Sequence, residues 1–474
     1  MGALLGLLVS YWTMRALRLL APDEQIRNSI SAAVDGRVLL FSLAAAAVAA
    51  ILFGLLPALQ VSRPDLVGAL KEQAGSIAGG RGRLRRTLVV VQVALSLLLL
   101  TGSGLFLRSL RNLRTVDPGF EATNLVRFKV DPMLSGRDVE GAKAFYRELQ
   151  DRLRALPGVE SVGLAVVAIM EGDEWDSTVR VEGYESHDGE DMNPHFNSVS
   201  PGYFETLRIP ILSGQDFDDR LGTMARKAAV INQTFAKKYF GDKSPIGYHL
   251  SFDLAPTEPP NLEIIAVVAD AKYEQLGEQE IPRQVFVAYP QNEWATGMTA
   301  YVRSTLPSEQ VVEAVRREVK GLDAGVPIFD LSTMEDQLDR SLAIQKLVAF
   351  LSSAFGMLAT VLALVGLYGV TAYGVARRSR EIGIRMALGA ESSKVVRTVL
   401  FEVMALAAIG VTIALPMTWW LTKLVASQLY GVEPRDPVSF AIAIGSLLAV
   451  AMLAGALPAR RASRVDPAVV LRYE

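Results

Sequence analysis

Long apolar blocks near both ends of the chain constrain its fold more than any other feature. A helix that crosses a bilayer needs about 20 mostly apolar residues. Six stretches meet that length, at about residues 2–20, 38–59, 88–107, 347–370, 399–421 and 438–457. The first is the weakest because Arg15 and Arg18 shorten its apolar core. With 50% hydrophobic residues and a mean hydropathy of +0.27, the sequence predicts a multi-pass α-helical membrane protein of about six spans.

Basic residues between these stretches predict the orientation of the chain. Lys and Arg gather in cytoplasmic loops of membrane proteins. Three regions are rich in them, at residues 63–86, 377–397 and 460–472. Helix parity places all three regions on the same side of the membrane. We expect that side to be the cytoplasm, and we expect the C-terminus to lie there too. The short loop at 431–436 and the long polar region at 111–340 then lie outside the cytoplasm.

The long polar region predicts an α+β domain. Residues 144–156 carry apolar side chains at helical spacing, stop at Pro157-Gly158 and lead into a strand pattern at 159–167. A second helix follows Pro307 and precedes a strand at 326–331. Apolar runs at 228–231 and 262–268, bounded by turn residues, predict buried strands.

One segment of the sequence occurs twice. GLLPALQVSRPDLVGALK begins at Gly54 and GALPARRASRVDPAVVLR at Gly455, and the two align without a gap. The repeat motif comprises Leu56, Pro57, Ala58, Ser62, Arg63 and Asp65, matched by Leu457, Pro458, Ala459, Ser463, Arg464 and Asp466. Because the match is gap-free, we interpret it as the duplication of a unit that contains one helix and its cytoplasmic tail. The alternative is that two unrelated segments, each at the cytoplasmic end of a spanning helix, acquired similar sequences independently.

Catalytic or metal-binding signals are weak. The chain has no cysteine, and its histidines, His187, His195 and His249, lack a metal-ligand spacing. The acidic group of Glu171, Asp173, Glu174 and Asp176 has no calcium-loop pattern and is interpreted as solvated surface. A net charge of −2 gives no support for nucleic-acid binding. We therefore predict no metal site, no cofactor and no catalytic residues.

The most informative stretch follows the fourth apolar block, at 375–402. Ile382, Met386 and Leu388, with the later Val395, Val396 and Val399, could face lipid or a partner groove, opposite a charged face. Amphipathicity alone leaves open a helix that merely lies in the headgroup region.

A resemblance to a known family favours a partner. The pattern R-R-x-R-E-I-G-I-R-x-A-L-G-A at 377–390 resembles the coupling segment of FtsX-like permeases, which in that family docks against an ATPase. VSPGYFETL at 199–207 and GQDF at 214–217 resemble the extracytoplasmic domain of MacB-type permeases. The resemblance implies an ATPase-coupling segment composed of Arg378, Arg380, Glu381, Ile382, Gly383, Ile384, Arg385, Ala387, Leu388, Gly389 and Ala390.

The terminal LPA and LRYE sequences resemble a double-length permease group of acidobacterial type. That likeness implies the end of a first FtsX-like half at 1–86, including two helices and a basic linker, with the front of that half missing. It implies the first span of a second half at 87–110, a MacB-like periplasmic core domain at 111–342, and a C-terminal three-helix domain at 343–474 with its coupling segment at 375–398.

The resemblance implies a permease subunit in the bacterial inner membrane that serves export or mechanotransmission. The chain lacks a Gly-Lys dipeptide and hence a Walker A loop, so we expect ATP hydrolysis in a separate cytoplasmic ABC ATPase. Other expected partners are the lipid bilayer, a second permease half or a homodimer mate, and an extracytoplasmic adaptor. Alternatives are a transmembrane regulator of extracytoplasmic enzymes and a ligand-binding sensor, with a membrane enzyme least favoured. The substrate stays open.

Overall fold

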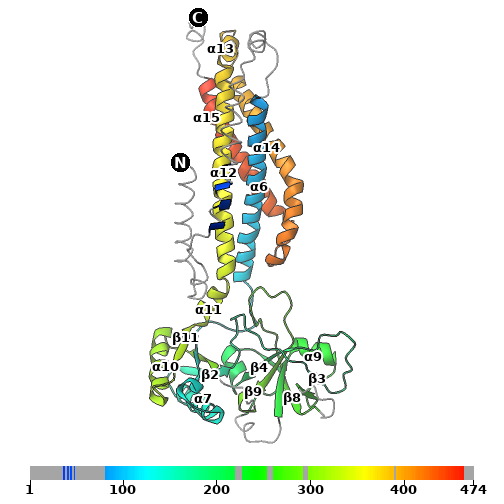
Figure 1. Ribbon diagram of the computed structural model, residues 1–474, viewed down its shortest axis with the longest axis vertical. Helices are drawn as coiled ribbons and strands as arrows, with labels where there is room; N and C mark the ends of the chain where they lie inside the picture. The colour runs from blue at the N-terminus through cyan, green and yellow to red at the C-terminus, as the bar shows by residue number, and fades with distance from the viewer. Residues whose placement is uncertain are drawn as a thin grey trace. The chain divides into compact units, whose positions relative to one another are not determined.

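The computed structural model describes residues 36–37, 40–41, 43–44, 47, 81–218, 227–252, 260–291, 297–388 and 391–463. The chain divides into two compact units. One is a sheet domain spanning Leu113–Leu342, and the other is a helical unit formed by the segments before and after it (Figure 1). Each unit is described by itself.

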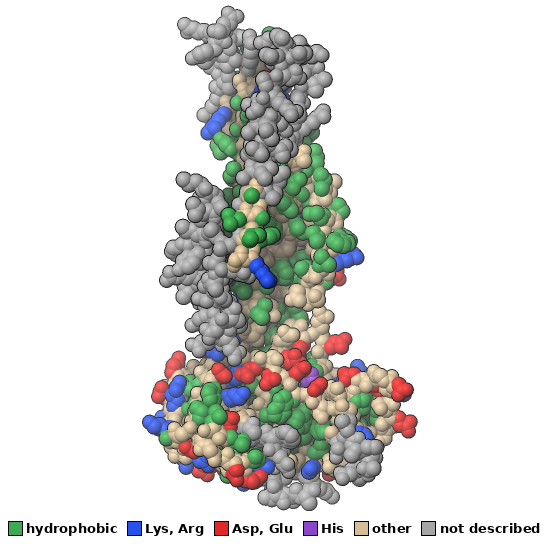
Figure 2. Space-filling model, in the orientation of Figure 1, with side chains coloured by type: hydrophobic (Ala, Val, Ile, Leu, Met, Phe, Trp, Pro, Cys, Tyr) green, Lys and Arg blue, Asp and Glu red, His purple; other side chains and the backbone are tan. Residues whose placement is uncertain are grey.

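The helical unit contains four long apolar helices among its described residues. They are α6 (Arg81–Arg114), α12 (Ala343–Arg377), α14 (Ser392–Leu421) and α15 (Pro437–Ala462). Each is long and apolar enough to cross a membrane. Figure 2 shows the hydrophobic side chains exposed along this unit. Four of the six expected spans correspond to these helices, whereas the two at 2–20 and 38–59 lie outside the described residues apart from isolated positions.

Small residues bring these helices close together around α6. A Cβ atom added at Gly410 of α14 would lie 2.8 Å from Val93 Cβ on α6, so the two backbones approach without a side chain between them. Ser103 on α6 shares a 3.1 Å hydrogen bond with Ser353 of α12. A Cβ atom added at the neighbouring Gly104 would lie 3.5 Å from Ser439 Cβ of α15, so this stretch of α6 packs against two helices.

The described part of the sheet domain contains one mixed sheet in the order β11-β1-β10-β2-β4-β9-β6-β8-β7-β3, with β5 beside β8. The pairs β4–β9 and β6–β8 are parallel, and the other pairs are antiparallel. The strands are β1 (Leu125–Val130), β2 (Val159–Ala165), β3 (Arg180–Val181), β4 (His195–Val199), β5 (Ile211–Gly214), β6 (Lys227–Asn232), β7 (His249–Ser251), β8 (Leu262–Val268), β9 (Gln284–Ala288), β10 (Met298–Ser304) and β11 (Ile328–Thr333).

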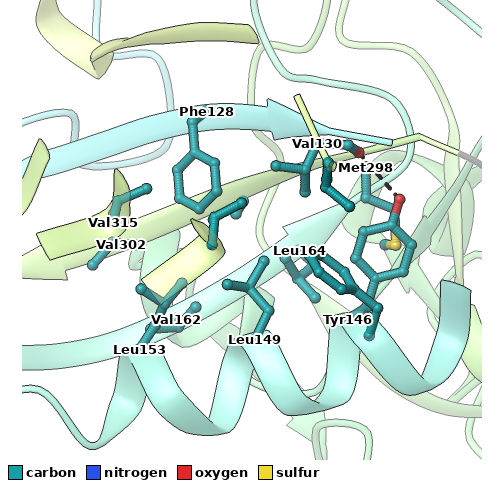
Figure 3. Close-up of a cluster of buried hydrophobic side chains, with 14 of the residues drawn as sticks. Phe128, Val130, Tyr146, Leu149, Leu153, Val162, Leu164, Met298, Val302 and Val315 are labelled. Carbon is teal, nitrogen blue, oxygen red and sulfur yellow. Dashed lines mark hydrogen bonds between the residues drawn. The ribbon is translucent and has the colours of Figure 1, made fainter. Parts of the chain in front are cut away.

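Helices in the sheet domain build two apolar cores. On one face of β1, β10 and β2 lie α7 (Val139–Arg154) and α10 (Ser308–Leu322). The α7 helix starts at the Asp138 cap, which accepts a 2.8 Å hydrogen bond from Gly141 N, and it buries Leu149 and Leu153 against the strands (Figure 3). A second core gathers under α9 (Gln233–Phe240), against β6, β8 and β9. The described part of the domain also contains two short α-helices, α8 (Tyr203–Leu207) and α11 (Met334–Ser341).

The opposite face of β1 and β10 buries two arginines. Arg303 donates to the carbonyl oxygens of Thr206 at 2.7 Å, Thr123 at 2.7 Å and Glu121 at 2.5 Å. Arg127, fully buried, pairs with Glu171. Because alternate residues of a strand point to opposite faces, these cations lie away from the apolar core. Glu171 lies at the surface, as expected from the sequence, and is also the ion-pair partner of this buried arginine.

The expected α+β character is confirmed element by element. The predicted helices at 144–156 and after Pro307 are α7 and α10, and the predicted strands are β2, β6, β8 and β11.

We expect Leu149→Ala to weaken the α7 core strongly. Leu149 is fully buried, so its truncation should lower the unfolding free energy of this domain by about 3 kcal/mol, or about a hundredfold in opening equilibrium. Hydrogen exchange of β2 amides in the full chain in detergent measures that change. Leu134→Ala is the control, because Leu134 is 64% exposed and its loss should change exchange less than about twofold. Equal effects in both variants would contradict the packing described.

Candidate functional site

The expected coupling segment forms a short helix between two long ones. After α12 ends at Arg377, the chain bends at Arg378 and continues as α13 (Ser379–Ala387), whose first turn closes through a 2.9 Å bond from Ile382 N to Arg378 O. Leu388 N bonds to Ile384 O at 3.0 Å and ends the helix. Gly389 and Ala390 lie outside the described residues, as does the side chain of Arg380.

Exposure separates the apolar side chains of this segment into two groups. Ile384 and Leu388, one helical turn apart, are 43% and 83% exposed. Ile382 and Met386 are half-buried and Gly383 is buried. Among the described residues of this segment, the large apolar side chains that are exposed are therefore Ile384 and Leu388, which we call the α13 apolar pair.

The sequence suggested that three valines at the start of α14 face lipid or a partner, but two of them are buried. Val395 and Val399, on α14, are each 9% exposed, and Val396 is only half-buried. The first two face the interior of the bundle, so assigning them to a partner groove was wrong. A period of 3.6 residues predicts a stripe but not its direction, and here the valine stripe continues into the buried Val403.

Charged side chains surround the α13 apolar pair. Arg385 pairs with Glu381 at 2.5 Å along α13, and both are more than half exposed. Arg378 reaches Glu402 of α14 at 2.7 Å. Exposed pairs of this kind add at most about 1 kcal/mol each, so they orient the segment more than they stabilise it. Ala387, also exposed, completes the described surface.

The helices around α13 are joined at the same end of the bundle. Arg461 of α15 donates to the Tyr368 hydroxyl of α12 at 2.9 Å, and the Arg85 guanidinium of α6 lies 4.4 Å from the centre of the Tyr373 ring. Both contacts join a neighbouring helix to α12, the helix that leads into α13.

The second copy of the repeat motif lies at this end too. Leu457 is 57% exposed, whereas Pro458 and Ala459 are buried within α15. Ser463 ends the helix, and its carbonyl accepts a bond of 3.4 Å from the Ser392 hydroxyl at the start of α14. Arg464 and Asp466 lie outside the described residues, as do Leu56, Pro57, Ala58, Ser62, Arg63 and Asp65.

The opposite end of the bundle is closed by polar contacts to the loop between α14 and α15. Asp436 caps α15 by accepting from Ser439 N at 2.7 Å, and it also pairs with Arg108 of α6. Asn112 donates to Gly431 O at 2.8 Å. The loop is thereby attached to α6.

A second polar cluster, in the sheet domain, was not foreseen from the sequence. His195 Nε2 lies 2.9 Å from a Glu174 carboxylate oxygen and 3.6 Å from one of Glu274. Burial, reinforced by Glu174 and Glu278, raises the pKa of the Glu274 carboxyl to about 7. Glu174 is exposed, as expected from the sequence, but it also has His195 as a partner. Its partners come from distant segments, so spacing could not reveal them.

Two family models match the chain. The FtsX-like permease C-terminal domain matches residues 353–467, which include α13, and the MacB-like periplasmic core domain matches residues 88–322. Both domain types were expected from the sequence and are confirmed.

Curated relatives carry related names. The macrolide export ATP-binding/permease protein MacB of Azoarcus sp. is 26% identical over 60% of this chain and 44% of its own length. The Bacillus subtilis protein named "Uncharacterized ABC transporter permease YknZ" is 25% identical over 69% of this chain and 79% of its own. The pyoverdine export ATP-binding/permease protein PvdT of Pseudomonas aeruginosa is 23% identical over 59% and 42%. The chain thus spans less than half the length of the MacB and PvdT relatives.

Among solved structures, the periplasmic region of MacB from Actinobacillus actinomycetemcomitans aligns with a TM-score of 0.31 and 13% identity, covering 48% of this chain and 94% of that one. The extracellular domain of YknZ aligns with a TM-score of 0.29 and 17% identity, covering 44% and 100%.

Two aspartate substitutions test the division between free and packed apolar residues. Leu388→Asp should change the unfolding free energy by less than about 0.5 kcal/mol, because the side chain is 83% exposed. Val399→Asp should cost more than about 3 kcal/mol, since it buries a carboxylate without a partner. Thermal unfolding of the purified protein in detergent measures both. A low melting temperature for Leu388→Asp would show that Leu388 is packed.

Proposed function

This chain belongs to the family of FtsX-like ABC transporter permeases with a MacB-like periplasmic core domain, and from that premise we propose that it is the membrane-spanning permease subunit of an ABC-type export or mechanotransmission system. The observation that supports the proposal most directly is the α13 apolar pair, exposed inside a charged rim within the stretch that matches the FtsX-like model. The proposed partner of that surface is a separate cytoplasmic ABC ATPase, and this ATPase would hydrolyse the ATP.

The distribution of charge supports a cytoplasmic location for α13. Cytoplasmic ends of membrane helices are rich in Lys and Arg. The end of the bundle that carries α13 has many such residues, namely Arg85, Arg86, Arg377, Arg378, Arg385, Lys394, Arg397, Arg460 and Arg461. On this orientation the C-terminus is cytoplasmic and the sheet domain lies outside the inner membrane.

The chemistry of the α13 surface supports docking to a protein groove. Two apolar side chains one turn apart are the usual anchors of a helix in a groove. The surrounding Arg385–Glu381 and Arg378–Glu402 pairs are solvated and can exchange partners at little cost. A groove that covers the α13 apolar pair would remove it from water, which favours binding.

Mechanical coupling follows if the ATPase changes shape with nucleotide. A displacement of α13 reaches α12 directly through the bend at Arg378, the residue that also pairs with Glu402 of α14. Such coupling requires two conformations of the permease and a partner that shifts the equilibrium between them. It does not require a polar path through the membrane. Export is the favoured outcome, because the MacB and PvdT relatives are named for export. A second permease half or a homodimer mate, and an extracytoplasmic adaptor, are further proposed partners.

A cysteine crosslink tests the proposed docking surface. The chain has no native cysteine, so Leu388→Cys introduces a single thiol. With a co-expressed candidate ABC ATPase carrying a cysteine in its groove, we expect a disulfide whose yield changes severalfold on addition of ATP. Gel shift of the purified complex measures the yield.

The matched control is Phe350→Cys. Phe350 is also apolar and is 52% exposed, but it lies near the start of α12, far along the helix from α13. It should give no crosslink. Equal yields at both positions, or none at Leu388 with any ATPase encoded beside this chain, would remove the coupling role and favour the regulator or sensor alternatives.

A further inference from the structure

The sheet domain contains a group of three potential metal ligands from separate segments. They are Glu174 in the loop after β2, His195 at the start of β4, and Glu274 in the loop after β8. One donor atom from each lies within 4.8 Å of the other two. We propose that these three side chains form a binding site for one zinc-class divalent cation.

The donor set suits such an ion. Three ligands at about 2.1 Å from a tetrahedral Zn²⁺ lie roughly 3.4 Å from one another. The two distances from His195 Nε2, 2.9 Å to Glu174 and 3.6 Å to Glu274, fall on either side of that value. An imidazole nitrogen favours zinc and neighbouring transition metals, whereas calcium and magnesium prefer all-oxygen sites. The fourth position would be left to water.

Backbone contacts hold the ligands in place independently of any cation. Phe196 N donates to Trp175 O at 2.6 Å, which fixes the loop beside Glu174 against β4. The Glu278 carboxylate accepts from Glu274 N at 2.5 Å and from Gln275 N at 2.9 Å, closing the turn that carries Glu274. Preorganised ligands of this kind lower the cost of binding an ion.

Charge crowding also points to a cation. Glu174 and Glu274 both approach His195, and Glu278 lies close to Glu274. Carboxylates held together on a partly buried surface repel one another unless a proton or a cation is shared between them.

The two loops that supply the glutamates also contact the chain where it enters and leaves the domain. Met170 O accepts from Gln337 of α11 at 2.7 Å, and α11 is the last helix of the domain. On the other loop, Lys272 N donates to Pro118 O at 2.8 Å, near the first residues of the domain. Met170 N bonds directly to Tyr273 O at 2.7 Å. A cation bound by both Glu174 and Glu274 would strengthen the attachment of these two loops to each other.

Zinc binding by the full chain tests the proposal. The protein is purified in detergent with a tag that contains no histidine, stripped of metal, equilibrated with Zn²⁺ and desalted, and bound zinc is measured by mass spectrometry. We expect about one Zn²⁺ per chain. His195→Gln and Glu274→Gln should each weaken binding at least tenfold, because each removes one of three ligands. Co²⁺ should give a visible absorption band that His195→Gln abolishes.

His249→Gln is the matched control. His249 also pairs with a glutamate, Glu182, at 2.9 Å, but it does not belong to the three-ligand group. This variant should bind zinc like the wild type. Unchanged melting temperatures verify that the Gln variants remain folded.

Hydrogen exchange supplies an independent readout. Zn²⁺ should slow exchange at 171–176 and 270–278 severalfold in the wild type and not in His195→Gln. No stoichiometric zinc, equal zinc in His195→Gln and wild type, or displacement of zinc by millimolar Ca²⁺ would overturn the site. None of these outcomes depends on the coupling role of α13.

Discussion

The interior of a bilayer offers no water to pair with backbone polar groups, and the helical unit is organised by that constraint. Its described spans satisfy their backbones as helices, and they associate by close approach, as at Gly410 against Val93. Charged pairs such as Arg108–Asp436 and Arg378–Glu402 lie toward the ends of the bundle. The helix ends are therefore where a partner can act through charge and exposed apolar side chains.

Much of the fold could be predicted from sequence because its signals are local. Apolar length located α6, α12, α14 and α15, and alternating or helical spacing located elements such as α7 and β8. Strand order could not be predicted, since pairs such as β1 with β10 join residues far apart in the chain. The buried Arg303 was missed for the same reason, as its carbonyl partners lie on other segments.

The candidate sites divide in the same way. The coupling segment was located by its resemblance to a family motif, but its free face was not. Ile382 and Ile384 are equally apolar, and only the packing of α13 leaves the second more exposed. The group of Glu174, His195 and Glu274 has no sequence signature, because two loops and one strand that are far apart in the chain bring it together. The spacing of apolar residues predicts that a helix has an apolar face, but tertiary contacts determine which of those residues stay exposed.

The α12 helix has a mechanical consequence that follows from its length alone. It runs 35 residues without a proline, so at 1.5 Å per residue it is a rod about 50 Å long. A tilt of about 5° about one end would carry the other end about 4 Å sideways. A small rotation of α12 at the bend next to Arg378 therefore produces a sideways displacement that grows along the helix. This displacement requires no change in the internal hydrogen bonds of the helix.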